Sequence, residues 1–206
     1  MRYVLPIIAA LAATPVLADE TLLTLDGGVA ATLSMPDGEG PFPGVLMLHG
    51  FGSSRDEVGG MYATEAAALA EAGIASLHID FRGFGQSAGD PGHHTVDRQN
   101  EDAEAGIIGL DLGWRTIALK DTFFSSLSQH AILGDLAQYA GPFLSITGSQ
   151  DYYAMYAPLM QAAAAGDDTQ ALVIEGADHI YHVFDPSASS VAQVISVTTA
   201  RFLATL

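Results

Sequence analysis

Two polar residues that could do chemistry follow apolar segments in the second half of this chain. Asp151 comes shortly after the apolar residues 143–146, and His179 comes shortly after residues 171–174. If these segments are parallel strands, both residues lie beyond the carboxyl ends of the strands, where ligands bind in open sheets. A carboxylate and the imidazole that it orients form a pair that can move protons during acyl transfer. Asp151 and His179 are therefore candidate functional residues.

A G-x-S-x-G pattern, which can place a nucleophilic serine on a sharp turn between a strand and a helix, occurs at residues 85–89 with Ser87 in its centre. That turn requires an apolar strand directly before its first glycine and a helix directly after the serine. Here residues 80–84 separate the first glycine from the strand before it, and the loop-forming residues 89–92 follow the serine. Ser87 is therefore only a weak candidate nucleophile.

The composition is that of a folded and strongly acidic protein. Hydrophobic residues make up 49% of the 206 residues, which allows a sizeable core, and 24 acidic residues against 7 basic ones give a net charge of −17. Such a surface repels phosphate backbones and anionic membranes, so nucleic-acid partners are not expected. The absence of cysteine excludes disulfides, thiolate chemistry and cysteine-based metal sites.

Residues 1–18 have the pattern of a signal peptide. They begin with a positive charge, are largely apolar from 4 to 17, and end on Ala18 just before the acidic Asp19. The apolar stretch is short for a membrane helix, which needs about 20 residues. We therefore expect cleavage after Ala18, a secreted or periplasmic protein without a membrane span, and a single domain at residues 19–206.

Apolar segments and turn residues alternate along the chain in the order of an α/β protein. Strands alternate with helices from residue 44 onward, which predicts a mostly parallel sheet flanked by helices. The continuous apolar run 44–48 is typical of a strand buried on both faces. Asp185 and Pro186 are the expected N-cap and first-turn proline of the last helix. The predicted strands are 21–25, 29–34, 44–48, 74–79, 142–146 and 171–174, and the predicted helices are 61–72, 96–108, 155–165 and 187–206.

Four short motifs stand at the predicted ends of strands. They are LHGFGSSR at 48–55, DFRGFGQS at 80–87, GSQD at 148–151 and GADH at 176–179. Together they resemble the α/β-hydrolases of the esterase and dienelactone-hydrolase-like kind. The resemblance implies that Asp151 orients His179, that His179 transfers the proton, and that the backbone N–H of Phe51 is one donor of the oxyanion hole. It also implies a small-molecule ester as substrate and no cofactor.

The segment that carries the nucleophile in this family does not appear in the sequence pattern. After the predicted helix 96–108, a strand, a G-x-S-x-G turn and a helix should follow, and such a βαβ unit needs about 30 residues. Residues 116–139 instead resemble a later segment of the family, so we expect a deletion near 106–111. A short strand at 115–119 would place Ser126 beyond it, but the residues between them are not the glycines that the turn needs. Ser126 is therefore also a weak candidate nucleophile.

Three interpretations remain open. The first is a serine-hydrolase-family protein for carboxylic esters, incomplete relative to its family, with impaired or no activity because the nucleophile is missing. The second is a non-catalytic ligand-binding or interaction protein that reuses the hydrolase cleft, and the third is an active enzyme that uses Ser87 or Ser126. A metal site is not expected, because His179 and His182 have the spacing of a ligand pair but no third ligand converges with them.

Overall fold

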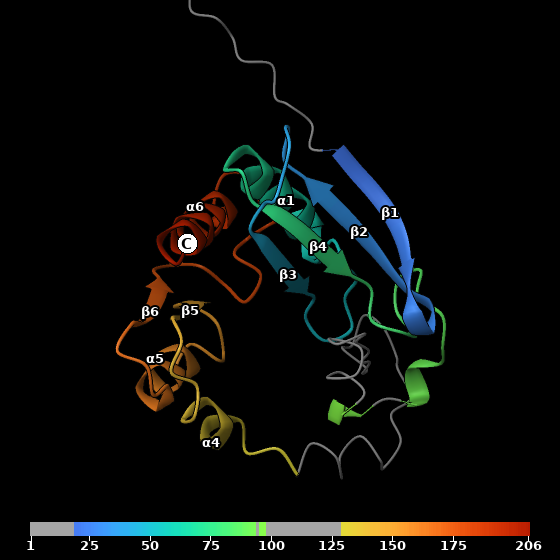
Figure 1. Cartoon of the computed structure of the whole chain (residues 1–206). Helices are drawn as coiled ribbons and strands as arrows, with labels where there is room; N and C mark the ends of the chain where they lie inside the picture. Colours follow the sequence, from blue (N-terminus) through green and yellow to red (C-terminus); the bar gives the residue numbers. More distant parts are fainter. Residues whose placement is uncertain (1–18, 94, 98–128) are drawn as a thin grey trace, which may run out of the picture.

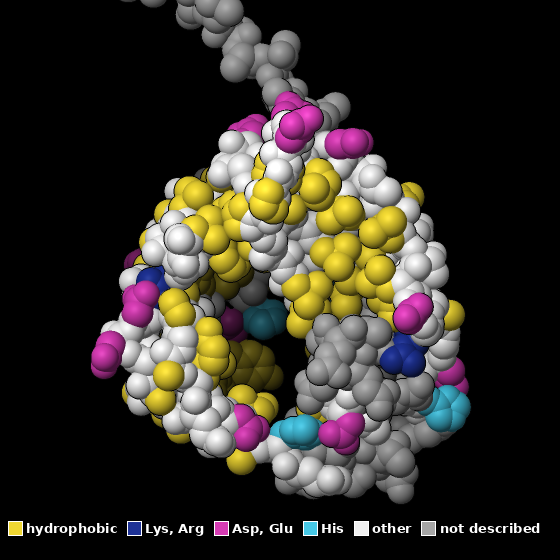
Figure 2. Space-filling view, in the orientation of Figure 1, with side chains coloured by type: hydrophobic (Ala, Val, Ile, Leu, Met, Phe, Trp, Pro, Cys, Tyr) yellow, Lys and Arg dark blue, Asp and Glu magenta, His cyan; other side chains and the backbone are white. Residues whose placement is uncertain are grey.

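Two β-sheets lie apart from one another in the computed structural model, which describes residues 19–93, 95–97 and 129–206 (Figure 1). The larger sheet has four strands in the order β1-β2-β4-β3, and the smaller one pairs β5 with β6. In the same orientation, Figure 2 shows a hollow in the surface between the part that holds the larger sheet and the part that holds the smaller sheet. The predicted signal peptide and most of the predicted helix 96–108 lie outside the described residues.

The first two strands form a hairpin. β1 (Asp19–Leu25) and β2 (Val29–Met35) are antiparallel, and the single-turn 3-10 helix η1 (Asp26–Gly28) joins them. Gly27 and Gly28 have φ angles of 75° and 78°, in the left-handed region that glycine adopts without the steric cost of a side chain. The sharp reversal between the strands depends on these two glycines.

A parallel β-α-β unit completes the larger sheet. β3 (Gly44–Leu48) leads through η2 (Val58–Gly60) and the helix α1 (Met61–Glu71) to β4 (Ala75–Ile79). β4 pairs parallel with β3 and antiparallel with β2, so it lies in the middle of the sheet. Gly73, with a φ of 80°, follows the end of the helix and turns the chain toward β4.

β3 is less buried than its apolar sequence indicates. Its side chains alternate between the two faces, and Met47, which is 6% exposed, packs with Leu69 of α1. Leu46 and Leu48 point to the opposite face and are 47% and 37% exposed. The expectation of a strand buried on both faces is therefore wrong. Within the described residues β3 pairs only with β4, so its side chains have a strand neighbour on one side alone.

The smaller sheet belongs to the second half of the chain. β5 (Phe143–Gly148) and β6 (Thr169–Ile174) pair in parallel, and the helix α5 (Tyr156–Ala163) connects them. The short helices η3 (Pro91–His93) and α4 (Ile132–Leu136) belong to the described residues between β4 and β5 in the sequence. Because β5 and β6 pair in parallel, their carboxyl ends lie side by side.

The last helix, α6 (Val191–Ala204), begins later than the sequence predicts. Asp185 and Pro186 do not start it. The Asp185 carboxylate instead accepts hydrogen bonds from the backbone N–H and the hydroxyl of Ser187, at 3.0 and 2.6 Å, and so forms a separate turn. Val194 on the inner side of the helix belongs to the core under β6. The predicted start at 187 is wrong because an aspartate can cap a turn as readily as a helix.

α1 and α6 pack against each other and join the two halves of the molecule (Figure 1). Glu65 of α1 is 7% exposed, and its carboxylate accepts hydrogen bonds from the hydroxyls of Thr198 at 2.8 Å and Thr199 at 3.2 Å in α6. These bonds satisfy a carboxylate that has no cation beside it in the described part of the chain. The contact between the helices therefore includes buried polar interactions.

The described elements confirm the α/β class and refine the sheet. Helices flank both sheets, the pairs β3–β4 and β5–β6 are parallel, and the two pairs that involve β2 are antiparallel. The described strands thus lie in two sheets, where the sequence predicts one that is mostly parallel. None of the helices in the described ranges has the length and apolar character to span a membrane.

Candidate active site

The structure brings Asp151 and His179 together. They lie in the loops after the parallel strands β5 and β6, and His179 Nδ1 is 3.0 Å from Asp151 Oδ2. The carboxylate also accepts hydrogen bonds from the backbone N–H of Tyr153 at 2.8 Å and from the hydroxyl of Thr147 at 3.2 Å. The aspartate side chain is 9% exposed and the imidazole is 70% exposed. The carboxylate is thus held in place, while the imidazole faces solvent.

Hydrogen bonds keep the Asp151 carboxylate ionised. Burial by itself raises the pKa of this group, but the hydrogen bonds from Tyr153 and His179 outweigh burial and lower the pKa below its ordinary value of 3.8. An ionised carboxylate at Nδ1 of His179 orients the ring and leaves Nε2 to exchange a proton with a substrate. The pair can therefore act as an oriented base.

The loop that carries His179 is held by neighbours that no sequence motif reveals. Asp178 Oδ1 accepts hydrogen bonds from the backbone N–H groups of Ile180 at 3.1 Å and His182 at 2.8 Å. The Tyr181 hydroxyl donates to a backbone carbonyl of β5 at 3.1 Å. Tyr181 and His182 have φ angles of 56° and 51°, a left-handed conformation that residues other than glycine seldom adopt. These contacts stabilise the turn that presents the imidazole.

The turn after β3 carries Phe51 and is braced by a carboxylate. The backbone N–H of Gly50 donates to Glu57, whose second oxygen accepts from the N–H of Val58 at 2.8 Å. The N–H of Ser53 closes the turn by donating to the carbonyl of Gly50 at 3.1 Å. Phe51 therefore lies in an ordered turn at the carboxyl end of β3, the place that the resemblance implies for an oxyanion donor.

His49 links this turn to the loop after β4. Its Nδ1 is 2.7 Å from the carbonyl of Gly50, and its Nε2 accepts a hydrogen bond from the N–H of Phe81 at 3.1 Å. Burial lowers the pKa of His49, and an acceptor on one side with a donor on the other matches the neutral ring protonated at Nδ1. His49 is therefore a structural link and not a free base.

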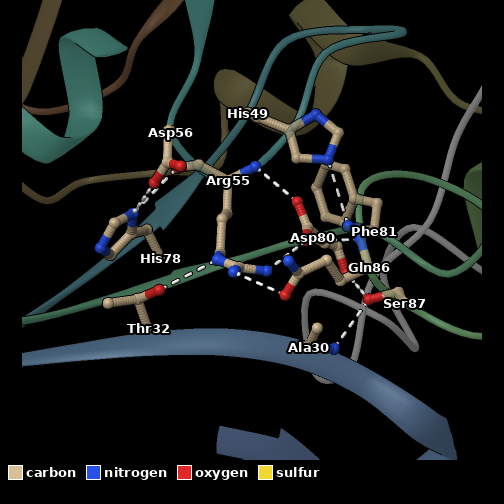
Figure 3. Close-up of polar contacts among 10 residues, drawn as sticks. All are labelled: Ala30, Thr32, His49, Arg55, Asp56, His78, Asp80, Phe81, Gln86 and Ser87. Atoms are coloured by element: carbon tan, nitrogen blue, oxygen red, sulfur yellow. Dashed lines mark hydrogen bonds and ion pairs between the residues drawn. The ribbon is translucent and has the colours of Figure 1, made fainter. Parts of the chain in front are cut away.

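A buried ion pair connects the loop after β3 with the loop after β4 (Figure 3). The guanidinium of Arg55 contacts the carboxylate of Asp80, and the two side chains are 9% and 2% exposed. Asp80 also accepts hydrogen bonds from the backbone N–H of Arg55 at 2.7 Å and of Gln86 at 2.9 Å. Arg55 donates in addition to the hydroxyl of Thr32 at 2.9 Å. Because its partners are all internal, this cluster is a rigid support.

Ser87 belongs to that support. Its hydroxyl accepts a hydrogen bond from the N–H of Ala30 at 2.7 Å and donates to the carbonyl of Asp80 at 2.5 Å (Figure 3). The hydroxyl proton is thus already engaged, and no contact joins Ser87 to His179 in the described structure. Ser126, the other candidate nucleophile, lies outside the described residues.

The turn after β3 and the loop after β6 lie side by side. Gly59 touches Val183, and any larger residue at position 59 would collide with that side chain. The Tyr62 hydroxyl donates to the carbonyl of Leu48 at 2.8 Å. Burial is the main reason that the pKa of Tyr62 rises to about 12, and the nearby Tyr181 contributes to the shift. The loops that carry the candidate oxyanion donor and the candidate base therefore meet at one edge of the molecule.

This arrangement of strands recurs in solved structures. Est1E from Butyrivibrio proteoclasticus, solved with ferulic acid bound, aligns over 90% of this chain and 98% of its own, with a TM-score of 0.68 and 16% identity. Alpha/beta hydrolase domain-containing protein 10 from mouse aligns over 89% and 98%, with a TM-score of 0.64 and 14% identity. The chain has the α/β-hydrolase fold. Dienelactone hydrolase from Anabaena variabilis, at a TM-score of 0.58 and 18% identity, aligns over 92% of this chain and 99% of its own.

Sequence comparisons match parts of this chain to known proteins. Residues 41–107 match the family described as serine aminopeptidase, S33. An uncharacterized 31.7 kDa protein of Escherichia coli is 36% identical over 78 residues, which are 38% of this chain and 26% of that protein. Peroxisomal succinyl-coenzyme A thioesterase of Mus musculus is 29% identical over 115 residues, 50% of this chain and 26% of that protein. The chain thus spans about a quarter of the length of the curated relatives that it matches.

In this α/β-hydrolase fold, the described residues bring together Asp151 and His179, the candidate acid and base, and order the turn that carries the candidate oxyanion donor Phe51. No serine hydroxyl of the described ranges is hydrogen-bonded to His179. No group of three or more histidine, aspartate or glutamate side chains in those ranges converges as a metal site. The arrangement can therefore move a proton to or from a bound carbonyl compound.

Proposed function

We propose that the chain is a protein of the carboxylic ester hydrolase kind whose acid–base pair is in place and whose hydrolytic activity is impaired or lost. The observation that carries the proposal is the 3.0 Å contact between His179 Nδ1 and Asp151 Oδ2, in loops that follow neighbouring parallel strands. Its ligands are small-molecule esters. The signal-peptide pattern at residues 1–18 supports a secreted or periplasmic location.

The chemistry of an intact site defines the role of each residue. A serine hydroxyl attacks the ester carbonyl while His179 takes its proton at Nε2, and Asp151 stabilises the charged ring. The backbone N–H of Phe51 donates to the oxyanion that develops. His179 then returns the proton to the leaving alcohol, and a water molecule repeats the sequence to release the acid.

Without the serine, the acid–base pair has only water to activate. The covalent intermediate cannot form, so the reaction loses the step that divides a difficult displacement into two easier ones. Serine proteases stripped of their triad keep about 10³–10⁴-fold acceleration, which comes from the oxyanion hole and from binding. The second oxyanion donor of this fold follows the serine in sequence, so it would be lost together with it. We therefore expect slight turnover at most.

The edges of β3 and β5 that pair with no described strand support the proposal that a segment is deleted. Within the described residues β3 and β5 each have a single strand neighbour, and Leu46 and Leu48 of β3 remain partly exposed. Folded proteins usually pair, cover or charge such an edge, and β3 carries neither a charge nor a proline. We infer that the strand, turn and helix expected between them are deleted near residues 106–111.

Labelling with a fluorophosphonate tests the proposal. We expect no labelling of the purified chain, and hydrolysis of p-nitrophenyl acetate no more than slightly above that of a His179→Ala variant. An active serine hydrolase labelled in parallel is the control for the reagent. A labelled serine would overturn the proposal, and the modified peptide would identify the nucleophile. Resequencing of codons 100 to 115 tests the deletion independently.

Non-catalytic ligand binding is the second candidate function. It is favoured by the exposure of the His179 imidazole, which is 70% open to solvent beside the exposed ring of Tyr153. An open polar and aromatic surface can bind a ligand without transforming it. Saturable binding of an ester or its product acid, with neither labelling nor turnover, would favour this function.

A further inference from the structure

Three tyrosines occur in the five residues after Asp151, and all are open to solvent. Tyr152 is 88% exposed, Tyr153 is 53% exposed and Tyr156 is 47% exposed. Single exposed aromatic residues are ordinary, but a contiguous exposed patch is more often a binding surface. We refer to Tyr152, Tyr153 and Tyr156 as the tyrosine cluster. Its exposure shows that the cluster is not part of the core.

The rings of the tyrosine cluster contact each other. The centroids of Tyr152 and Tyr153 are 5.2 Å apart with their planes at 88°, and those of Tyr153 and Tyr156 are 6.0 Å apart at 48°. Both arrangements lie within the range of favourable aromatic pairs. The three side chains therefore form one connected aromatic surface with Tyr153 in its middle.

This surface continues into the candidate active site. The ring of Tyr153 lies 5.9 Å from the imidazole of His179, with the two planes at 62°. The backbone N–H of Tyr153 also donates to Asp151 at 2.8 Å, so the carboxylate that orients the imidazole also positions the tyrosine. A substituent on an ester carbonyl that lies beside the imidazole would therefore reach the ring of Tyr153.

We propose that the tyrosine cluster is a subsite for an aromatic ring carried by the ester, a step that rests on the ester-binding site proposed above. An aromatic ring can add edge-to-face or offset contacts to Tyr153, which contribute beyond the area that they bury. A saturated ring of the same size buries similar area without those contacts. The ring should carry no negative charge, because the ionised Asp151 and the net charge of −17 repel an anionic group.

A matched pair of amides tests the subsite without depending on turnover. N-benzylbutanamide and N-(cyclohexylmethyl)butanamide share the same carbonyl chain and differ in the aromaticity of the ring, and amides resist the hydrolysis that an ester could undergo. Titrations followed by NMR of the tyrosine and histidine ring protons give both dissociation constants. We expect the benzyl compound to bind about 3- to 10-fold more tightly.

Two substitutions at one position separate ring contacts from apolar area. Tyr153→Phe keeps the ring and should preserve the benzyl preference, whereas Tyr153→Leu keeps an apolar side chain and should bring the ratio of the two dissociation constants close to one. Tyr139→Leu is the matched control, because Tyr139 is 48% exposed and lies at the opposite end of β5 from Asp151. Circular dichroism verifies that each variant is folded, and Tyr152→Leu provides a second test if Tyr153→Leu is not.

The outcomes separate this proposal from the proposed function. Equal binding of the two amides, no binding of either, or a benzyl preference that survives Tyr153→Leu would overturn the aromatic subsite. None of these results bears on whether the chain hydrolyses esters. A benzyl preference that Tyr153→Leu abolishes would support the subsite even if fluorophosphonate labelling revealed an active serine.

Discussion

Asp80 and Asp151 each follow a strand of this molecule, and each holds a basic side chain from the loop after a neighbouring strand. Asp80 contacts Arg55, with exposures of 2% and 9%, and Asp151 contacts His179, with exposures of 9% and 70%. Both carboxylates also accept backbone N–H groups, from Gln86 in the first case and Tyr153 in the second. The two pairs differ mainly in the exposure of the basic partner.

That difference separates a structural role from a chemical one. The guanidinium of Arg55 has its hydrogen bonds inside the protein and cannot lose its proton under ordinary conditions. The imidazole of His179 has one nitrogen on Asp151 and most of its surface in water, so it can exchange a proton with a ligand. A buried basic partner is therefore suited to stabilising the fold, whereas an exposed one is suited to exchanging a proton with a ligand.

The largest effect is expected when the buried pair loses its cation. Arg55→Ala leaves the Asp80 carboxylate buried without its counter-charge, and we expect the free energy of unfolding to fall by about 3–5 kcal/mol. Urea denaturation followed by circular dichroism measures this loss. Arg201→Ala is the control, because its partner Asp168 is 56% exposed and such pairs contribute about 1 kcal/mol or less. Equal losses in both variants would contradict the comparison.

A smaller loss is expected at the serine that completes the support. Ser87→Ala removes the partner of the Ala30 N–H and of the Asp80 carbonyl, which should lower the free energy of unfolding by about 1–3 kcal/mol. The variant should leave reactivity toward fluorophosphonate unchanged. Ser196→Ala, at an exposed position on α6, is the control and should change stability by about 0.5 kcal/mol or less. Loss of a label that the parent chain carries would assign Ser87 a chemical role.

Glu65 adds a third case to the comparison, because it is a buried carboxylate with no cation beside it among the described residues. Burial raises its pKa, and the hydrogen bonds from Thr198 and Thr199 only partly offset that rise. The folded protein therefore binds this proton more tightly than the unfolded chain. The resulting stabilisation is complete below the unfolded pKa and is lost as pH rises through the folded pKa.

Glu65→Gln should remove this pH dependence and leave the contact with α6 intact, since an amide oxygen can accept the same hydrogen bonds. Thermal unfolding of the variant and the parent from pH 4 to 8 measures the difference, which should grow in favour of the variant as pH rises. Glu71→Gln, at an exposed position on the same helix, is the control. Parallel curves for parent and Glu65→Gln would refute the expected shift.

The smallest effect on stability is expected at the exposed pair. Asp151→Asn should change the free energy of unfolding at pH 7 by about 1 kcal/mol or less, because its partner is largely in water. Any residual ester turnover should nevertheless fall to the level of His179→Ala. The lowered pKa of Asp151 predicts that its contribution is present above pH 3.8 and is lost as pH falls through the folded pKa.

Urea denaturation at pH 7 and pH 3, together with p-nitrophenyl acetate hydrolysis, measures both quantities for Asp151→Asn. Asp167→Asn, at an exposed loop position, is the control. A loss as large as that of Arg55→Ala would show that the Asp151 pair is a structural support as well, and the distinction drawn from exposure would fail.

Local sequence patterns predicted the order of the elements well. The apolar run 44–48 and the glycine after α1 define a strand and the end of a helix, because side-chain alternation and glycine conformations are local properties. Asp151 and His179 were singled out as candidates because each comes shortly after a predicted strand, and the structure places their side chains in contact. The start of α6 was missed because Asp185 and Pro186 favour a turn and a helix alike.

What the sequence by itself determined is the order of the described strands and longer helices and the approximate place of each along the chain. Only the tertiary structure decided that Asp151 touches His179, that the Ser87 hydroxyl is engaged by Ala30 and Asp80, and that Leu46 remains exposed on β3. These outcomes depend on which strands become neighbours, and residues far apart in the chain meet only after the sheets have formed. Periodicity shows which side chains share a face of a strand, whereas strand order and burial determine what each side chain contacts.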